Sequence, residues 1–95
     1  MRIRYTVRAS ADLAASRSDL QERNPRAAAA ALAAIRTRIG WLADFPLIAP
    51  ETDEPGVRAL PLVRYPYRIY HEIAGEEVRI LHIRHTRRQP WRRGP

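Results

Sequence analysis

The 95-residue chain is expected to form a single domain over residues 1–95, because chains divide into separate cores only well above this length. Apolar residues make up 45% of it, which supports a folded core and excludes a disordered composition. The absence of cysteine excludes disulfides, cysteine-ligated zinc and thiol nucleophiles. No apolar run approaches the roughly 20 residues that span a bilayer, and the N-terminus has no apolar signal segment, so we expect a cytosolic protein.

The net charge of +7 is distributed unevenly. All 17 basic residues are arginine. Residues 1–56 hold eight arginines and seven acids, whereas residues 57–95 hold nine arginines and three acids. The C-terminal portion therefore carries the positive field, which favours an anionic partner such as nucleic acid, an acidic protein segment or phosphate. The alternative is that the arginines form a basic surface that only keeps the protein in solution.

The chain opens on an alternating pattern over residues 2–7. Apolar residues that favour strands take turns there with charged or polar residues, which is typical of a strand with one buried face. The residues expected on that face are Ile3, Tyr5 and Val7. We therefore expect a strand over the whole segment.

A first helix is expected over residues 11–23. Ser10 stands at the N-cap position, where its side chain would accept a backbone N–H. Asp12 would lie in the first turn, near the positive end of the helix dipole. Leu13 and Leu20 lie seven residues apart and are expected on the buried face.

A second helix, the longest element, is expected over residues 25–44. Asn24 is a good N-cap, and Pro25 suits the first helical position because it loses no needed hydrogen bond there. The apolar positions step by four and three residues, as one helical face requires. They are Ala28, Leu32, Ile35, Ile39 and Leu42. The short connection predicts an antiparallel helical hairpin, within which we expect Trp41 to pack.

The rest of the chain is predicted to be a loop followed by strands. Residues 45–56 contain three prolines and show no periodicity, so they indicate a loop. Strands are expected over residues 57–63, 65–73 and 77–85. Pro61 indicates a bulge or an edge strand, and Ala74-Gly75 indicates a tight hairpin turn. The order β-α-α-β-β-β predicts an α+β fold, with the helical hairpin on one face of a small, largely antiparallel sheet. The tail from about residue 89 is expected to fray.

Six segments of the chain stand in an informative order and spacing. They are Ala11-Asp12-Leu13, Asn24-Pro25-Arg26-Ala27-Ala28, Leu42-Ala43-Asp44-Phe45-Pro46, Arg58-Ala59-Leu60, Tyr67-Arg68-Ile69-Tyr70 and Ile80-Leu81-His82-Ile83-Arg84-His85-Thr86-Arg87-Arg88. Together they resemble the RelE/ParE superfamily of bacterial type II toxins over nearly the whole chain. The sequences YRIYHEI and ILHIRH look closer to the ParE branch of that superfamily.

The resemblance implies a RelE/ParE-like fold and a cytoplasmic toxin that a cognate antitoxin, encoded beside it, neutralises. RelE-like members cut mRNA on the ribosome, whereas ParE-like members act on DNA gyrase, so the shared fold does not decide the target. The resemblance also implies that operator DNA is bound through the antitoxin, with no cofactor and no membrane involved. The interpretation that we favour is a ParE-like toxin. The alternatives are a RelE-like mRNA interferase, which is an endoribonuclease, and a non-toxic basic binding module.

If the chain were a nuclease, four residues would be candidates for its chemistry. They are Arg68, His85, Arg87 and Arg88. By resemblance, Arg68 and one of the two C-terminal arginines would contact phosphate, which a guanidinium group binds bidentately. His85 would act as a general acid or base, since a histidine pKa near neutrality allows either role. The structural alternative is that Arg68 pairs with an acid and His85 closes the last strand.

Two departures from the RelE-like pattern favour the branch that is not a nuclease. RelE-like members carry lysines around the site and a tyrosine near the C-terminus, whereas this chain has no lysine and has Trp91 near the tyrosine's position. An indole does not transfer a proton as a phenol does. Glu72 is a candidate base only through its position in a strand.

Residues that bind the target are expected mainly among the C-terminal arginines. They are Arg58, Arg64, Arg68, Arg84, Arg87, Arg88 and Trp91. A basic sheet with an apolar component also fits the antitoxin, an acidic amphipathic segment that would fold on binding. The last strand is a candidate edge that would accept an added strand.

No metal site and no cofactor are expected. His82 and His85 lie three residues apart in a strand and so point to opposite faces, and His71 belongs to the preceding strand. A common metal centre for the three histidines is therefore disfavoured.

Overall fold

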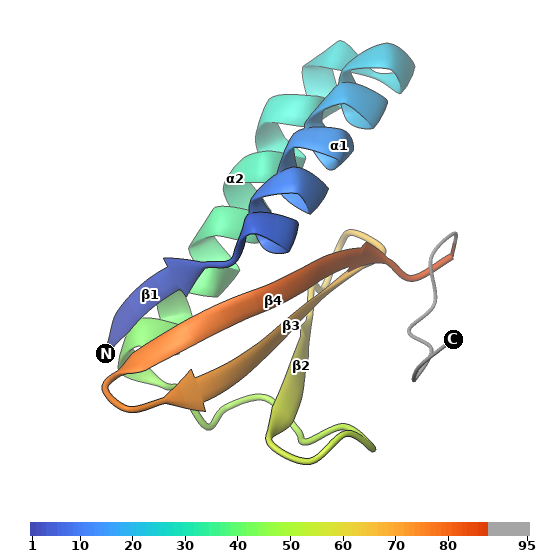
Figure 1. Cartoon of the computed structure of the whole chain (residues 1–95). Helices are drawn as coiled ribbons and strands as arrows, with labels where there is room; N and C mark the ends of the chain where they lie inside the picture. The colour runs from blue at the N-terminus through green and yellow to red at the C-terminus, as the bar shows by residue number, and fades with distance from the viewer. Residues whose placement is uncertain (88–95) are drawn as a thin grey trace.

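The computed structural model describes residues 1–87, and within them the chain forms two helices and four strands. The elements are β1 (Arg2–Tyr5), α1 (Val7–Arg23), α2 (Pro25–Asp44), β2 (Val57–Pro61), β3 (Tyr67–Ala74) and β4 (Glu77–His85). Figure 1 shows the helical hairpin on one side of the sheet, with its connecting end extending beyond the strands. The predicted β-α-α-β-β-β order and α+β class are confirmed. The predicted tail from about residue 89 lies outside the described residues.

The four strands form one sheet in the order β1-β4-β3-β2. β1 runs parallel to β4, and the other two neighbouring pairs are antiparallel, so the sheet is mixed but largely antiparallel. The expectation that the last strand lies at an edge is wrong, because β4 lies between β1 and β3. The hairpin of β3 and β4 leaves the outer side of β4 free, and β1 occupies that side with its apolar residues toward the helices.

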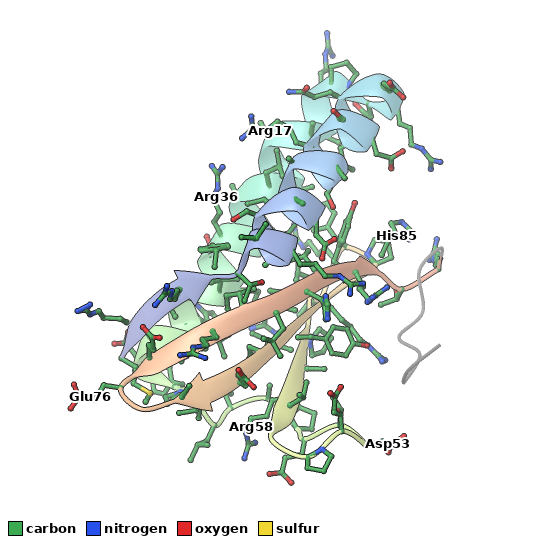
Figure 2. The ribbon with its side chains drawn as sticks, viewed as in Figure 1. Arg17, Arg36, Asp53, Arg58, Glu76 and His85 are labelled. Carbon is green, nitrogen blue, oxygen red and sulfur yellow. The ribbon has the colours of Figure 1, made fainter. Side chains whose placement is uncertain are left out.

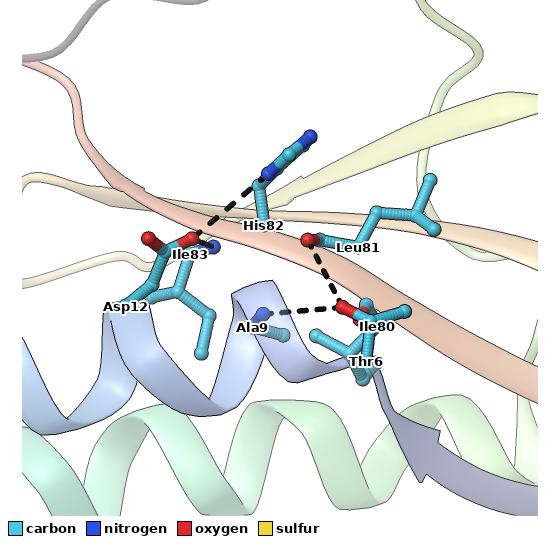
Figure 3. A network of polar contacts seen from close by, with 7 residues as sticks. All are labelled: Thr6, Ala9, Asp12, Ile80, Leu81, His82 and Ile83. Atoms are coloured by element: carbon cyan, nitrogen blue, oxygen red, sulfur yellow. Dashed lines mark hydrogen bonds and ion pairs between the residues drawn. The ribbon is translucent and has the colours of Figure 1, made fainter.

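The first helix begins four residues earlier than expected, at Val7. Thr6 caps it: its hydroxyl oxygen accepts a hydrogen bond from the N–H of Ala9 at 3.1 Å and donates one to the carbonyl of Ile80 at 2.8 Å (Figure 3). The expected N-cap, Ser10, is therefore a helical residue. Val7, which the alternating pattern placed on the buried face of a strand, is 90% exposed. The bond from Thr6 to β4 fixes this earlier cap, and local sequence does not reveal it.

The second helix has the expected bounds, and Asn24 caps it through a 3.2 Å bond from the N–H of Ala27. All five residues of the predicted apolar stripe are buried. The expectation for Trp41 is wrong, because its side chain is 45% exposed and stacks under the guanidinium of Arg38, 4.6 Å from the ring centre.

The core lies between the helices and the facing side of the sheet. Its fully buried members include Ile35, Ile39, Leu42, Ile69, Ile80 and Ile83. A smaller apolar cluster lies on the opposite side of the sheet and consists of Val57, Ala59 and Tyr70, with Leu81 packed against it. We call these two sides the helix face and the open face. No helix in residues 1–87 is long and apolar enough to cross a membrane.

Asp12 joins the first helix to the centre of the sheet. One of its carboxylate oxygens accepts the N–H of Ile83 at 3.1 Å and lies 3.9 Å from Nδ1 of His82 (Figure 3). β1 ends at Tyr5, which pairs with Ile80, so within residues 1–87 no strand pairs with β4 on the side to which the N–H of Ile83 points. The side chain of Asp12 satisfies this N–H in place of a neighbouring strand. Asp12 was expected to act on the helix dipole, but it instead accepts a backbone N–H of β4 beyond the end of β1.

The strand bounds follow the sequence closely, and Pro61 lies at an edge as expected. β2 ends at Pro61, two residues earlier than predicted, and β3 begins two residues later than predicted. The loop before β2 folds back along its outer side: the N–H of Ala59 donates to Pro50 at 3.1 Å, and that of Thr52 donates to Val57 at 2.8 Å. Gly75 adopts φ +62° in the β3–β4 turn, a conformation that favours glycine.

Candidate functional site

The open face of the sheet is hollowed between β3, β4 and the loop that precedes β2. This hollow has a volume of about 500 Å³. Its polar lining includes Arg68 and Arg84 from the strands and Asp53 from the loop, and Tyr70 contributes an aromatic wall. A depression of about 320 Å³ adjoins it through Arg68 and also contains Arg64 and Arg87. We call Arg64, Arg68, Arg84 and Arg87 together the arginine surface.

Arg68 and Arg84 lie directly opposite each other across the β3–β4 pair. Like charges in this cross-strand position destabilise a sheet unless an anion compensates them. Asp53 lines the same hollow, so the protein supplies part of that counter-charge. Arg68 is exposed, and its guanidinium is therefore available to a carboxylate or a phosphate. The geometry suits the binding of anionic groups.

His85 lies on the opposite side of the sheet from Arg68. It is paired across strands with Tyr67, a core residue that is 3% exposed, and the two rings meet edge to face at 5.2 Å. Figure 2 shows His85 on the helix side of β4. Neighbouring residues of a strand point to opposite faces, so Arg68 and Arg84 share one face while Tyr67 and His85 share the other. The structure does not bring Arg68 and His85 together.

Arg87 lies just beyond β4, where it is exposed, and its backbone N–H donates to Nδ1 of His85 at 3.3 Å. This bond gives His85 a local structural partner at the end of the strand. Arg88 and Trp91, which were predicted to contribute to the site, lie outside the described residues. Of the predicted nuclease set, the structure therefore places Arg68, His85 and Arg87, on two sides of the sheet.

Arg58 has an internal role, although the sequence placed it among the target-binding residues. Its side chain is only 22% exposed. One terminal nitrogen donates to the carbonyl of Ala49 at 2.7 Å, and the other lies 3.5 Å from a carboxylate oxygen of Glu51. The guanidinium group thus holds the loop before β2 against the sheet. Residue type alone does not distinguish such an arginine from one that is exposed for binding.

The histidines do not form a common centre. His71 is fully buried; its Nδ1 lies 3.0 Å from the carbonyl of Ile69, and its Nε2 has no hydrogen-bond partner. Burial lowers the pKa of His71. The hydrogen bond to the carbonyl of Ile69 raises this pKa, and the nearby charge of Arg58 lowers it. No group of three or more histidine, cysteine, aspartate or glutamate side chains in residues 1–87 is placed to hold a metal ion.

Burial also lowers the pKa of His82, the histidine beside Asp12. The positive charges of Arg8 and Arg84 add to this effect, while Asp12 opposes it. His82 packs edge to face against Tyr70, with ring centres 6.5 Å apart. Burial therefore favours the uncharged form of His82.

A second groove, of about 410 Å³, was not foreseen from the sequence. It lies where the helical hairpin meets β1, and Arg17 and Arg36 extend from this flank of the hairpin (Figure 2). Tyr5 lines it, and burial raises the pKa of Tyr5 although the charge of Arg36 lowers it. The four-residue spacing of Leu13 and Arg17 on one helix is the sequence signal that indicates a shared face.

Comparisons with known proteins identify the family. The model of the ParE toxin of the parDE type II toxin–antitoxin system matches residues 3–90. A solved structure of the chromosomal ParDE toxin–antitoxin system from P. aeruginosa is similar, with a TM-score of 0.80 and 30% identity over 90% of this chain and 95% of that one. The toxin–antitoxin complex RelBE2 from Mycobacterium tuberculosis is similar with a TM-score of 0.56 and 26% identity, over 88% and 95% of the two chains. The sequence has no match among curated proteins.

Proposed function

The chain belongs to the ParE toxin family of type II toxin–antitoxin systems, and on that premise we propose that it inhibits bacterial growth by acting on DNA gyrase and is neutralised by a cognate antitoxin. The proposed site of action is the cytoplasm, where gyrase works on DNA. Operator DNA would be reached only through the antitoxin. No cofactor takes part in this proposal, which rests on protein–protein contacts.

The separation of Arg68 from His85 is the observation that carries the choice of gyrase over mRNA. A nuclease that uses the 2′-hydroxyl needs a base or acid and a cation at one phosphate. Here Arg68, one candidate cation, and His85, the candidate acid or base, lie on opposite faces of the sheet. Arg68 and Arg84 offer charge and shape without that pairing, which suits a toxin that works by contact.

The arginine surface also supports an acidic antitoxin as partner. Arg64 and Arg87 extend the charge of Arg68 and Arg84 over two adjoining depressions. The apolar cluster around Tyr70 lies at the floor of the open face, so a partner would meet charge and apolar area together. A segment that folds on binding gains both contributions while it covers a large surface.

The decisive experiment compares two assays on one purified toxin. Supercoiling by purified gyrase and cleavage of ribosome-bound mRNA are measured with the wild type, His85→Gln and Arg68→Gln. We expect gyrase inhibition that His85→Gln leaves intact and that Arg68→Gln weakens, with Arg26→Gln, an exposed arginine at the start of α2, as the charge-matched control. Ribosome-dependent mRNA cleavage that His85→Gln abolishes would overturn the proposal and identify an mRNA interferase. Inactivity in both assays, with a neighbouring gene product that does not bind, would leave a basic binding module.

A further inference from the structure

Two pairs of arginines lie side by side across the strands of the sheet. The register places Arg4 of β1 next to Arg79 of β4, and Arg68 of β3 next to Arg84 of β4. Neighbouring like charges of this kind weaken a sheet. Glu77 offsets the first pair in part, because its carboxylate lies 3.2 Å from Arg79 and 3.7 Å from Arg4. A bound anion would stabilise both pairs, so the sheet suits a partner that carries several negative charges.

The first pair points to the open face, as the second does. On β1, Arg4 lies between two residues whose side chains pack against the core, so its own side chain points away from the helices. On β4, Arg79 lies between Val78 and Ile80, both fully buried in the core, and points the same way. The open face therefore carries four strand arginines.

An irregularity in β4 is what places Arg79 and Arg84 on one face. Residues five apart in a regular strand point to opposite faces. Here the register with β3 shifts between Ile80 and His82, which leaves Leu81 without a partner on β3. One extra residue in a strand displaces the alternation by one position, so the two arginines come to share a face.

The stretch between the two pairs is also basic. Burial lowers the pKa of His82, which lies between Arg79 and Arg84 on β4, and the charge of Arg8 lowers it further, so Arg8 acts on this stretch. Arg8 is exposed at the start of α1. The side chains of Arg4 and Arg79 are 69% and 44% exposed. We call this continuous row the arginine track; its members are Arg4, Arg8, Arg68, Arg79 and Arg84.

The length of the arginine track suits a chain of phosphates better than one small anion. Arg79 and Arg84 lie about 15 Å apart along β4, since a strand rises about 3.3 Å per residue. Duplex DNA carries one phosphate charge for about every 1.7 Å of its axis, so roughly nine fall within that length. One duplex can therefore meet both arginine pairs, whose guanidinium groups bind phosphate bidentately.

Buried rings beside the arginine track favour a duplex over a single strand. Proteins bind single-stranded nucleic acid by stacking its bases on exposed aromatic side chains. Tyr70 and Tyr67 are only 4% and 3% exposed, and Tyr65 packs against the core. Both helices lie on the opposite side of the sheet, so neither can enter a groove of the duplex from this face. The contacts would therefore go to phosphates.

We propose that the arginine track binds the phosphate backbone of duplex DNA, so that the toxin contacts the DNA held by gyrase as well as gyrase itself. The inference rests on the proposed gyrase target. Phosphate contacts carry no sequence information, so this site is distinct from operator recognition. Glu51 and Asp53 line the hollow on the side of the loop before β2, and their carboxylates would keep the duplex over β4 and β1.

Binding of a labelled duplex of arbitrary sequence, followed by fluorescence anisotropy, tests the site directly. Arg68→Gln with Arg79→Gln should raise the Kd at least about tenfold at low salt, and should lower the slope of log affinity against log salt by about 2. Arg23→Gln with Arg26→Gln, at the connecting end of the helical hairpin, is the charge-matched control. Equal losses from the two double variants would show that net charge alone governs binding and would overturn the track.

A second substitution predicts a gain of binding. Glu77→Gln removes the carboxylate beside Arg4 and Arg79 and should lower the Kd for the duplex several-fold at low salt. Glu22→Gln, near the end of α1, removes the same charge far from the sheet and should change the Kd little. An unchanged Kd for Glu77→Gln would contradict a phosphate contact at this end of the track. Tighter binding of a single-stranded RNA of equal length would replace DNA with RNA as the ligand.

The role of the contact in toxin action is tested on gyrase with and without bound DNA. Wild-type toxin should bind the gyrase–DNA complex more tightly than gyrase alone, and Arg79→Gln should weaken only the former. Equal weakening of both would assign Arg79 to a gyrase contact and overturn the proposal. Equal wild-type affinity for both would also overturn it, while gyrase remains the target. Duplex binding that depends on the track, without inhibition of supercoiling, would support the DNA site and reject gyrase.

Discussion

The two faces of the sheet use the same strands for different purposes. The helix face buries Ile69, Ile80 and Ile83 completely against the hairpin, whereas the open face places Arg68 opposite Arg84 beside a small apolar cluster. Strand alternation lets one segment serve both, since successive residues of a strand point to opposite faces of the sheet. Stability should therefore depend on one face, and partner binding on the other.

The largest effect is expected from the helix face. Ile35→Ala removes a fully buried side chain of α2 and should lower the free energy of unfolding by about 2–5 kcal/mol, because it leaves a cavity in a well-packed core. Urea denaturation measures this change. Trp41→Ala, at a residue that is 45% exposed on the same helix, should cost much less. Equal costs for the two variants would mean that α2 does not face the sheet as described.

Asp12 should come next, because it satisfies a backbone group of the central strand. Asp12→Ala leaves the N–H of Ile83 without its 3.1 Å acceptor and should cost about 1–3 kcal/mol of unfolding free energy. Asp12→Asn, which keeps an acceptor oxygen, should recover much of the loss. Thermal or urea unfolding of both variants tests this point, and an Asp12→Ala variant as stable as wild type would show that the N–H of Ile83 needs no side-chain acceptor.

Stability should also decline in mild acid, through the buried histidines. The pKa values of His71 and His82 are lowered in the folded chain, so below about pH 6.5 the unfolded chain binds protons first. Unfolding free energy should therefore fall with pH in that range, by at most about 1.4 kcal/mol per pH unit for each histidine. His71→Gln should make the decline shallower. Urea midpoints from pH 7.5 to pH 5 measure it; a flat profile would indicate that both histidines stay solvated.

The smallest effect on folding is expected from the open face, with the opposite sign. Arg68→Gln removes one of two facing cations and should raise the unfolding free energy by about 0.2–1 kcal/mol at low salt, and by less as salt screens the pair. The same variant should bind its partner more weakly. Arg26→Gln is the control for charge alone. A destabilised Arg68→Gln variant would mean that the protein already compensates this pair fully.

The sequence was sufficient to predict the bounds of an element where the periodicity of its apolar residues agreed with its local capping residues. The α2 bounds and apolar stripe followed from Asn24, Pro25 and the helical spacing, and the limits of β4 followed from its strand-like residue pattern. It was insufficient where a contact with a residue far away in the sequence decided where a helix begins or where a strand lies in the sheet. Thr6 takes the N-cap from Ser10 because its hydroxyl also reaches β4, and β4 became an interior strand because β1 pairs with it in parallel.

The candidate site shows the same division. Arg64, Arg68, Arg84 and Arg87 could be identified by type and position, and the structure places them along two adjoining hollows. Arg58 could not be distinguished from them, because its bond to Ala49 depends on how the loop before β2 folds back. The groove at Arg17 and Arg36 was missed because it forms only where two helices and β1 meet.

The loop that closes β2 also limits how copies of this protein can associate. A sheet with two open edges can add strands at both and so grow into a filament. Here, within residues 1–87, the bonds of Thr52 and Ala59 leave one open edge. Any edge-to-edge association must therefore stop after a single addition and yield a closed pair. Even at the high local concentrations of overexpression, the folded chain should resist polymerisation through its sheet.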